Sequence, residues 1–168
     1  MGCGNIGKQI AKRLSAFDMR VIGFDTKVES NSFFDKIYGE NGKQIFISQC
    51  DYLVNCIPLT PNTERMLDKS WFSLMKKDIT IVNVARKELI NNSDFLSFLK
   101  ENHDVTAILD MFELIPNPIT NPYRRLSNVL VLPGVTAISN ESLERLHDLL
   151  RKNRDNFINS KPLLNVII

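Results

Sequence analysis

Short apolar runs, spaced regularly along the chain, constrain its fold more than any other feature. Five runs have the length and the Val, Ile and Leu content of buried strands: Val21–Phe24, Tyr52–Ile57, Ile79–Val82, Val105–Leu109 and Val129–Leu132. Segments with helical apolar spacing accompany them: Ile6–Ala16, Asn62–Met75 with a break, Ser93–Asn102 and Asn140–Asn159. The polar stretch Thr26–Lys43 predicts only a short helix around Phe33–Ile37. Strands that alternate with helices pair in parallel and are buried on both faces. The pattern therefore predicts an α/β fold with a doubly wound parallel sheet.

Length and composition are those of one ordinary globular domain. The chain has 168 residues, of which 43% are hydrophobic and 24% charged. Its net charge of +2 is too small and too evenly spread to predict binding to nucleic acid or an anionic membrane. No apolar run approaches the roughly 18 residues of a membrane span, and no signal-peptide pattern opens the sequence. Cys3, Cys50 and Cys56 lack the spacing of metal ligands, so we expect reduced thiols in a cytoplasmic protein and no metal site.

The first residues form a G-x-G-x-x-G pattern with Gly2, Gly4 and Gly7. An amphipathic helix and a strand follow, and the strand ends at Asp25, 18 residues beyond Gly7. Glycines let the backbone approach a pyrophosphate, and a helix N-terminus offers N–H groups and partial positive charge. A carboxylate at the position of Asp25 can accept hydrogen bonds from adenosine-ribose hydroxyls and would repel a 2′-phosphate. This context favours NAD over NADP; the alternative is a glycine turn with a strand-end Asp that only caps a nearby group.

Other segments carry more specific motifs, in a fixed order: Asp51–Thr63, Ile81–Arg86, Ile108–Glu113, Asn128–Pro133 and Pro162–Val166. Together with the glycine turn they resemble the NAD-binding domain of the D-2-hydroxyacid dehydrogenases, from Gly2 to Val166. The resemblance implies a Rossmann-like dinucleotide-binding domain over residues 1–150, and a segment, 151–168, that returns toward a substrate domain. It also implies an NAD-dependent oxidoreductase that moves a hydride between NAD(H) and a 2-hydroxy or 2-keto acid, and a homodimer. Which 2-hydroxy acid is used does not follow from the sequence.

The resemblance assigns further cofactor contacts: Asn5 and Ile6 under the pyrophosphate, Ile57, Pro58 and Thr63 on the adenine side, Val84, Ala85 and Arg86 at the nicotinamide ribose, and Asp110 at the carboxamide. Arg86 also matches the arginine that binds the substrate carboxylate. A guanidinium suits that role because it can pair with a carboxylate through two parallel hydrogen bonds. The alternative for Arg86 is a surface arginine at a strand end. Lys87 replaces a glycine of the family, which would cost about 1 kcal/mol if its φ were positive.

Two residues of the family's catalytic trio are replaced. The histidine that acts as acid and base corresponds to Gly134, and its glutamate partner corresponds to Ile115. Loss of a positioned acid/base typically lowers a rate by about 10²–10⁴-fold. His103 and His147 lie outside the motifs. The sequence therefore predicts impaired catalysis, and three alternatives stay open: a dehydrogenase whose acid/base comes from elsewhere, a non-catalytic NAD-binding or dimerisation module, or a decayed fragment.

Only Met1 precedes the glycine turn, where the family has a strand of about five to seven residues. That strand is central in a doubly wound sheet. We therefore expect a sheet whose first strand is mostly absent, with the strands that begin at Val21 and Tyr52 on either side of its place. On this interpretation the chain is the C-terminal part of a longer protein or a truncated gene product.

Overall fold

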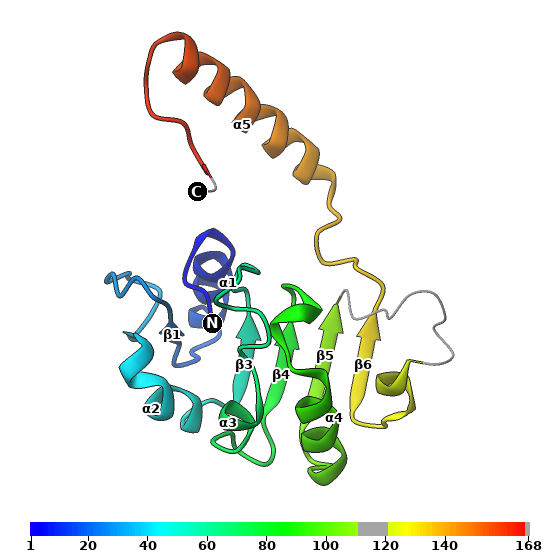
Figure 1. The fold of residues 1–168 in the computed structure, drawn as a ribbon. Helices are drawn as coiled ribbons and strands as arrows, with labels where there is room; N and C mark the ends of the chain where they lie inside the picture. Colours follow the sequence, from blue (N-terminus) through cyan, green and yellow to red (C-terminus); the bar gives the residue numbers. More distant parts are fainter. Residues whose placement is uncertain (111–120, 167–168) are drawn as a thin grey trace. The chain divides into compact units, whose positions relative to one another are not determined.

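A computed structural model describes residues 1–110 and 121–166. The chain divides into two compact units, Met1–Gly134 and Val135–Ile168. The first unit contains the strands, all paired in parallel (Figure 1): β1 (Ile22–Phe24), β2 (Lys36–Tyr38), β3 (Tyr52–Asn55), β4 (Thr80–Asn83), β5 (Thr106–Asp110) and β6 (Val129–Leu132). Its helices are α1 (Asn5–Ser15), α2 (Lys43–Ser48), α3 (Lys69–Phe72) and α4 (Asn92–Glu101), with 3-10 turns η1 (Glu40–Gly42), η2 (Lys87–Leu89) and η4 (Pro122–Arg125). The predicted Rossmann-like α/β fold is confirmed.

The strands form two hydrogen-bonded sheets, β1-β2 and β3-β4-β5-β6, which the first two residues join. The amino group of Met1 donates to the carbonyl of Val54 (2.7 Å), and the Met1 carbonyl accepts from Cys56 N (2.9 Å). On the other side, Gly2 N donates to the Phe24 carbonyl (2.9 Å). The strand order is therefore β2-β1-(Met1–Gly2)-β3-β4-β5-β6, which is the order of a dinucleotide-binding fold.

Between β1 and β3, beyond Met1, lies a cavity of about 170 Å³. Residues alternate their backbone groups between the two sides of a parallel strand. The residues of β1 and β3 that bond to β2 and β4 alternate with Ile22, Phe24, Tyr52 and Val54. The backbone N–H and C=O groups of these four residues therefore point to the side of the cavity. Its apolar lining comes from α1 (Ala11 and Leu14), from α2 (Phe46) and from β3 (Leu53). The expectation that these two strands flank the place of a first strand is confirmed.

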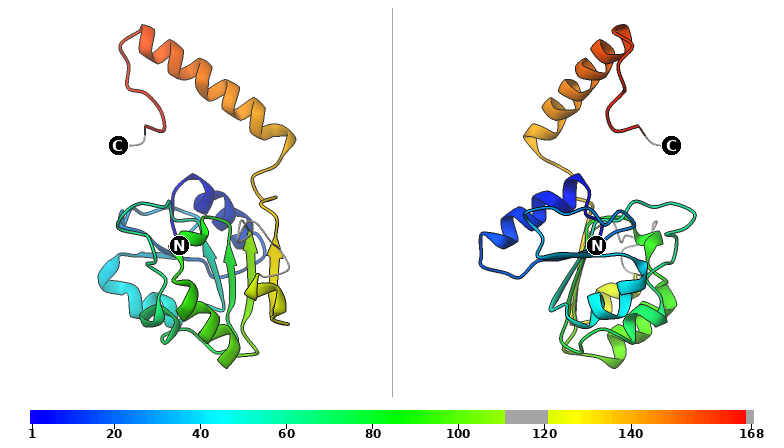
Figure 2. Two further views of the ribbon diagram at one scale, coloured as in Figure 1. Left: turned by 45° about the vertical axis from the view of Figure 1, so that its right-hand side comes forward. Right: turned by 90° about the vertical axis from the view of Figure 1, so that its left-hand side faces the viewer.

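The core lies on the face of the sheet covered by α2, α3 and α4 (Figure 2). Leu53, Ile81 and Ala107 form one row of this face and are at most 1% exposed. The ring of Phe72, the last residue of α3, stacks on the ring of Phe95 in α4, and their centroids are 5.2 Å apart. The opposite face is only half-buried, and Leu130 on β6 is 53% exposed there. The expected burial on both faces therefore holds for one face among the described residues.

Two of the predicted helices differ from the structure. The helix around Phe33–Ile37 was wrong, because Lys36–Tyr38 form β2 and pair with β1. Within Asn62–Met75 only α3 is α-helical, and it begins where Asp68 caps the backbone N–H of Ser70 (2.9 Å).

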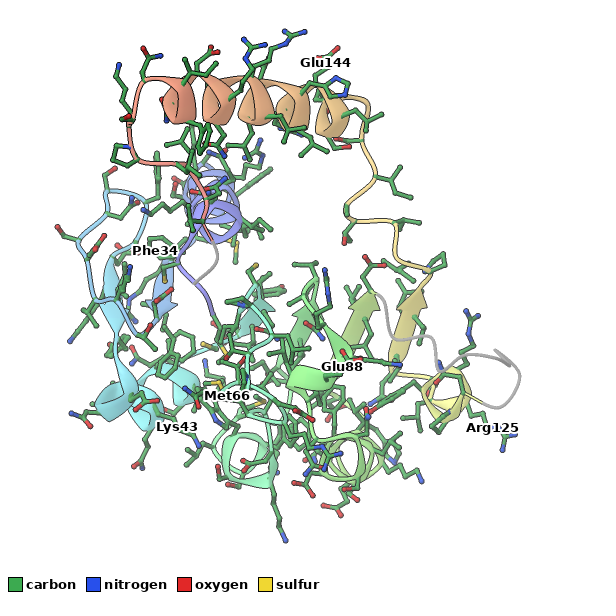
Figure 3. The ribbon with its side chains drawn as sticks, turned by 45° about the horizontal axis from the view of Figure 1, so that its top comes forward. Phe34, Lys43, Met66, Glu88, Arg125 and Glu144 are labelled. Atoms are coloured by element: carbon green, nitrogen blue, oxygen red, sulfur yellow. The ribbon has the colours of Figure 1, made fainter. Side chains whose placement is uncertain are left out.

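Helix α2 was not predicted, because the sequence before it is polar. It contacts α3 through Lys43. The ammonium of Lys43, a residue labelled in Figure 3, lies 4.6 Å from the centroid of the Trp71 ring and donates to Ser70 Oγ (2.7 Å). The two buried residues of α2, Phe46 and Ile47, enter the core, so this short helix is stabilised by packing and not by length.

The second unit consists of α5 (Asn140–Ile158) and the segment after it. The side chain of Asn153 accepts from Leu164 N (2.8 Å) and donates to the Leu164 carbonyl (3.0 Å), which folds that segment back along α5. A second amide, that of Asn156, donates to the Pro162 carbonyl (2.8 Å). Among the described residues, no helix combines the length and apolar character needed to cross a membrane.

Candidate functional site

The three glycines of the first turn differ in what a side chain at each position would meet. Gly2 has a φ of +79°, and a Cβ there would lie 2.9 Å from the backbone of Cys56. A Cβ on Gly7 would overlap the carbonyl oxygen of Gly2, so α1 can approach the turn only with glycine at this position. A Cβ on Gly4 would meet nothing within 4 Å. Two glycines therefore shape the turn, and the third leaves open space above the backbone.

That open space lies at the N-terminus of α1. Gly4 is the N-cap residue and offers no side-chain cap, and the first helical hydrogen bond runs from Lys8 N to the Gly4 carbonyl (2.9 Å). The N–H groups of Asn5, Ile6 and Gly7 therefore precede the regular bonding of the helix. Asn5 and Ile6 are exposed, Ile6 by 62%. An uncapped helix start beside an open glycine can bind an anion such as a pyrophosphate.

The carboxylate of Asp25, directly after β1, is fixed against this turn. Its Oδ2 accepts from Cys3 N (2.7 Å), and its Oδ1 accepts from Lys27 N (3.0 Å) and from Thr26 Oγ1 (3.4 Å). A carboxylate has about four acceptor positions, so it can still accept hydrogen bonds from a ligand. The structure places Asp25 beside the glycine turn, as the motif predicts.

The thiol nearest to this carboxylate is uncharged at neutral pH. Cys3 is buried in the turn, and burial raises the pKa of its thiol above the ordinary value. Burial likewise raises the pKa of Cys56, which follows β3. A thiolate would repel a phosphate. Because these thiols are uncharged, the turn presents its N–H groups without such a repelling charge nearby.

The loop after β3 is closed by the side chain of Thr63. The Thr63 hydroxyl donates to the Pro58 carbonyl (2.7 Å) and accepts from Thr60 N (2.8 Å). Ile57 is half-buried and Pro58 is exposed, so this loop offers an apolar edge next to the glycine turn. The role of Thr63 in the structure is to hold this edge in place.

The loop after β4 carries the candidate substrate arginine. Val84 is half-buried, Ala85 is buried, and Arg86 is exposed with a guanidinium that donates to the Ala85 carbonyl (3.2 Å). Lys87 begins η2 and is not among the residues with positive φ, so the replacement of the family's glycine costs no backbone strain here. Asp110 ends β5 and is buried (2% exposed).

All these residues follow the carboxyl ends of parallel strands or lie in the first turn. They therefore lie along one edge of the sheet, toward which the arrowheads point in Figure 1. Open α/β sheets bind ligands at this edge.

Gly134 also belongs to this edge, since it follows β6, and its φ is +75°. Ile115 lies outside the described residues. His103 is exposed and precedes β5, which places it at the opposite edge of the sheet. His147 is exposed on α5 in the other unit. Within the first unit, His103 therefore does not replace a side chain at Gly134.

Two residues of this edge were not singled out from the sequence. Asn55 and Asn83 end β3 and β4, are at most 1% exposed, and bond to each other through their side chains (3.1 Å). The signal that could have identified them is a polar residue closing an otherwise apolar strand, where the chain turns toward the ligand edge.

Comparison with known proteins identifies the family of this chain. Residues 1–135 match the family described as D-isomer specific 2-hydroxyacid dehydrogenase, NAD binding domain. D-3-phosphoglycerate dehydrogenase of Methanocaldococcus jannaschii is 34% identical over 145 residues, covering 84% of this chain and 27% of that protein. Glyoxylate reductase of Korarchaeum cryptofilum is 28% identical over 155 residues, covering 91% and 46%.

Among solved structures, the NADPH-dependent glyoxylate/hydroxypyruvate reductase of Sinorhizobium meliloti, in complex with NADP and sulfate, superposes with a TM-score of 0.86 at 26% identity. The match covers 99% of this chain and 54% of that one. The chain thus spans about half, or less, of the length of these relatives. It belongs to the D-isomer-specific 2-hydroxyacid dehydrogenase family, and residues 1–135 are its NAD-binding domain.

Proposed function

We propose that the unit Met1–Gly134 binds NAD along the carboxyl edge of its sheet and does not by itself reduce 2-keto acids. The observation that carries the binding proposal is the division of roles among the glycines. Gly2 and Gly7 are required by the backbone around them, whereas Gly4 leaves space that the protein does not use. A turn with glycine, and so no Cβ, at a position that has no protein neighbour leaves room for a ligand to approach the backbone closely.

The other site residues receive roles in the order in which they lie along the edge. N–H groups at Asn5 and Ile6 would hold the pyrophosphate, Asp25 the adenosine ribose, and Ile57, Pro58 and Thr63 the adenine side. Val84, Ala85 and Arg86 would contact the nicotinamide ribose, and Asp110 the carboxamide. The bound cofactor would supply the hydride acceptor or donor. The exposed guanidinium of Arg86 would bind the carboxylate of a 2-hydroxy or 2-keto acid.

We assign the preference for NAD over NADP to Asp25. The Sinorhizobium meliloti reductase was solved with NADP, so the fold accommodates either cofactor. In this chain the carboxylate of Asp25 is anchored by three donors and cannot easily turn away from the ribose. A 2′-phosphate placed there would meet a negative charge.

The absence of a side chain at Gly134 favours a non-catalytic NAD-binding module over an active dehydrogenase. A 2-keto acid bound at Arg86 would meet no proton donor from the end of β6. We further propose that the dinucleotide-binding domain extends through residue 150, that 151–168 return toward a substrate domain, and that the protein forms a homodimer as the family resemblance implies.

Calorimetric titration of the purified chain with NAD tests the binding proposal, with Gly4→Val as the key variant. We expect Gly4→Val to abolish measurable NAD binding while the Tm stays close to that of the wild type, because the new side chain enters open space and costs about 1 kcal/mol at the N-cap. Gly7→Val is the contrasting variant and should lose both binding and stability, since its side chain overlaps the Gly2 carbonyl. Absence of NAD binding by the wild-type chain, or undiminished binding by Gly4→Val, would contradict the proposal.

A further inference from the structure

Two buried asparagines connect the loops that hold the two halves of the candidate cofactor site. Asn55 and Asn83 face each other in register at the ends of β3 and β4. Asn55 Oδ1 accepts from the backbone N–H of Ile57 (3.2 Å), and Asn83 Oδ1 accepts from the backbone N–H of Ala85 (3.2 Å). Each side chain therefore makes the same turn, to the N–H two residues ahead, at the start of its own loop.

The two turns are joined through the side-chain amides. Asn55 Nδ2 donates to Asn83 Oδ1 (3.1 Å), the same oxygen that accepts from Ala85 N. Asn83 Nδ2 in turn donates to the carbonyl of Arg86 (3.2 Å). A continuous chain of hydrogen bonds thus runs from the N–H of Ile57, on the adenine side, to the carbonyl of Arg86, on the nicotinamide side.

A second connection lies further along the same two loops. Arg65 N donates to the Glu88 carbonyl (2.7 Å), and Leu67 N donates to the Leu89 carbonyl (3.0 Å); Glu88 is labelled in Figure 3. The loop after β3 and the loop after β4 are therefore held together at both ends, so their separation is fixed by the protein itself.

We infer that Asn55 and Asn83 act as one positioning unit, which fixes the distance between the adenine-side loop and the Arg86 loop so that a ligand spanning both is favoured. This inference rests on the proposed function for the identity of that ligand. Both side chains are buried, so we infer that they act through the loops and not by touching the cofactor.

The alternative is that each asparagine only closes its own turn. Two serines could then close the two turns equally well, because a serine hydroxyl can make the same turn, and burying two side-chain amides would not be needed. The shared oxygen of Asn83 is the feature that distinguishes the two views. If the pair is one unit, loosening either turn must loosen the other.

Amide hydrogen exchange of the purified chain, without any ligand, tests the coupling. Asn83→Ser should keep a hydroxyl for its own turn but cannot reach Asn55, and we expect the Ile57 amide to exchange about tenfold faster in this variant. Reciprocally, Asn55→Ser should accelerate exchange at Ala85. Asn83→Leu and Asn55→Leu, which remove each side-chain amide altogether, should show the same cross effects.

Asn128→Leu is the matched control. Its amide donates to the carbonyls of Leu99 and Asn102 (3.1 and 3.2 Å), at the opposite edge of the sheet. This variant should leave Ile57 and Ala85 unchanged. Acceleration confined to the altered loop, or spread evenly over the whole unit, would overturn the inference.

A second experiment compares NAD with AMP, which reaches only the adenine side. In Asn83→Ser we expect the NAD affinity to fall about tenfold and the AMP affinity to change less than about threefold, since only NAD spans both loops. An equal loss of both affinities would indicate a merely structural role and overturn the inference. If the wild-type chain bound neither ligand, the proposed function would fail, whereas the exchange experiment would still decide whether the asparagines are coupled.

Discussion

Asp25 and Asp35 anchor the two ends of β1 in the same way, yet only one of them can take part in binding. Asp35 Oδ2 accepts from Val21 N (2.7 Å) where β1 begins, and Asp25 Oδ2 accepts from Cys3 N (2.7 Å) where it ends. Each Oδ2 thus accepts one backbone N–H at the same distance, although Oδ1 of Asp25 accepts from two further donors. The difference is the edge of the sheet, because the carboxyl ends of the strands meet the glycine turn and the amino ends do not.

This pair gives a matched test of cofactor choice. We expect the wild-type chain to bind NAD more tightly than NADP, and Asp25→Ala to weaken NAD binding by about 10–100-fold, since hydrogen bonds to a charged group are worth about 1.5–3 kcal/mol. Asp35→Ala should lower the Tm without changing the ratio of the two affinities. Calorimetric titrations of the three proteins with both dinucleotides measure this ratio, and tighter or equal binding of NADP by the wild type would show that Asp25 is wrongly placed.

At the scale of single residues, the sequence alone could assign a role to residues whose role depends on their neighbours in the chain. The spacing of Gly2, Gly4 and Gly7 predicted a turn before a helix, and the structure adds the clash that Gly2 and Gly7 avoid and the open space beside Gly4. Asn55 and Asn83 could not be assigned in this way, because their partners come from different strands. A bond between residues 28 positions apart depends on the register of the sheet, which no local pattern records.

Among the elements, the strands were the most predictable. Continuous apolar runs mark strands that are buried in a parallel sheet, and each run overlaps one of β1, β3, β4, β5 and β6. β2 was missed because its three residues lie within the polar stretch Thr26–Lys43, and it becomes a strand by pairing with β1, where Ile37 lies opposite Gly23. The helix expected over Asn62–Met75 is mostly absent because its first part is bound to η2 through backbone hydrogen bonds, as at Leu67.

The cavity between β1 and β3 allows an experiment on a single added strand. An extension that ran back from Met1 would alternate between the two edges, facing the groups of Ile22 and Phe24 on one side and of Tyr52 and Val54 on the other. By this alternation, four residues would provide partners for the backbone groups that face the cavity, and apolar side chains would fill it. We expect four Val or Ile residues placed before Met1 to raise the Tm by about 5–10 °C.

The control for this extension is a polar one of equal length, Ser-Gly-Asp-Gly. Both extensions convert the buried amino group of Met1, whose pKa is lowered by burial, into an amide. The difference between their thermal melts therefore reports the strand alone. Equal melting temperatures for the two extended proteins, or a cooperative high-temperature transition of the 168-residue chain that neither extension improves, would refute the argument.

At the scale of the whole molecule, the proposed site has residues for binding but no side chain for proton transfer at Gly134. The glycine turn, Asp25 and Arg86 lie along the carboxyl edge of the sheet, where we propose that they bind a dinucleotide and a carboxylate. The end of β6 brings Gly134 to the same edge, where it contributes backbone but no side chain. Binding and proton transfer are separable requirements, since the first depends on shape and charge and the second on one positioned acid.

We therefore expect the purified chain to bind NADH but to reduce no 2-keto acid at a measurable rate. The reason is the lack of a proton donor at Gly134, which costs about 10²–10⁴-fold on its own. Glyoxylate, hydroxypyruvate and pyruvate serve as substrates, with NADH oxidation followed by absorbance. Gly134→His alone should not restore turnover, because the φ of +75° strains a histidine by about 1 kcal/mol and the position of the family's glutamate carries Ile115. NADH binding measured in parallel separates loss of chemistry from loss of cofactor. Robust turnover by the unaltered chain would contradict the prediction and would require another acid within reach of Arg86.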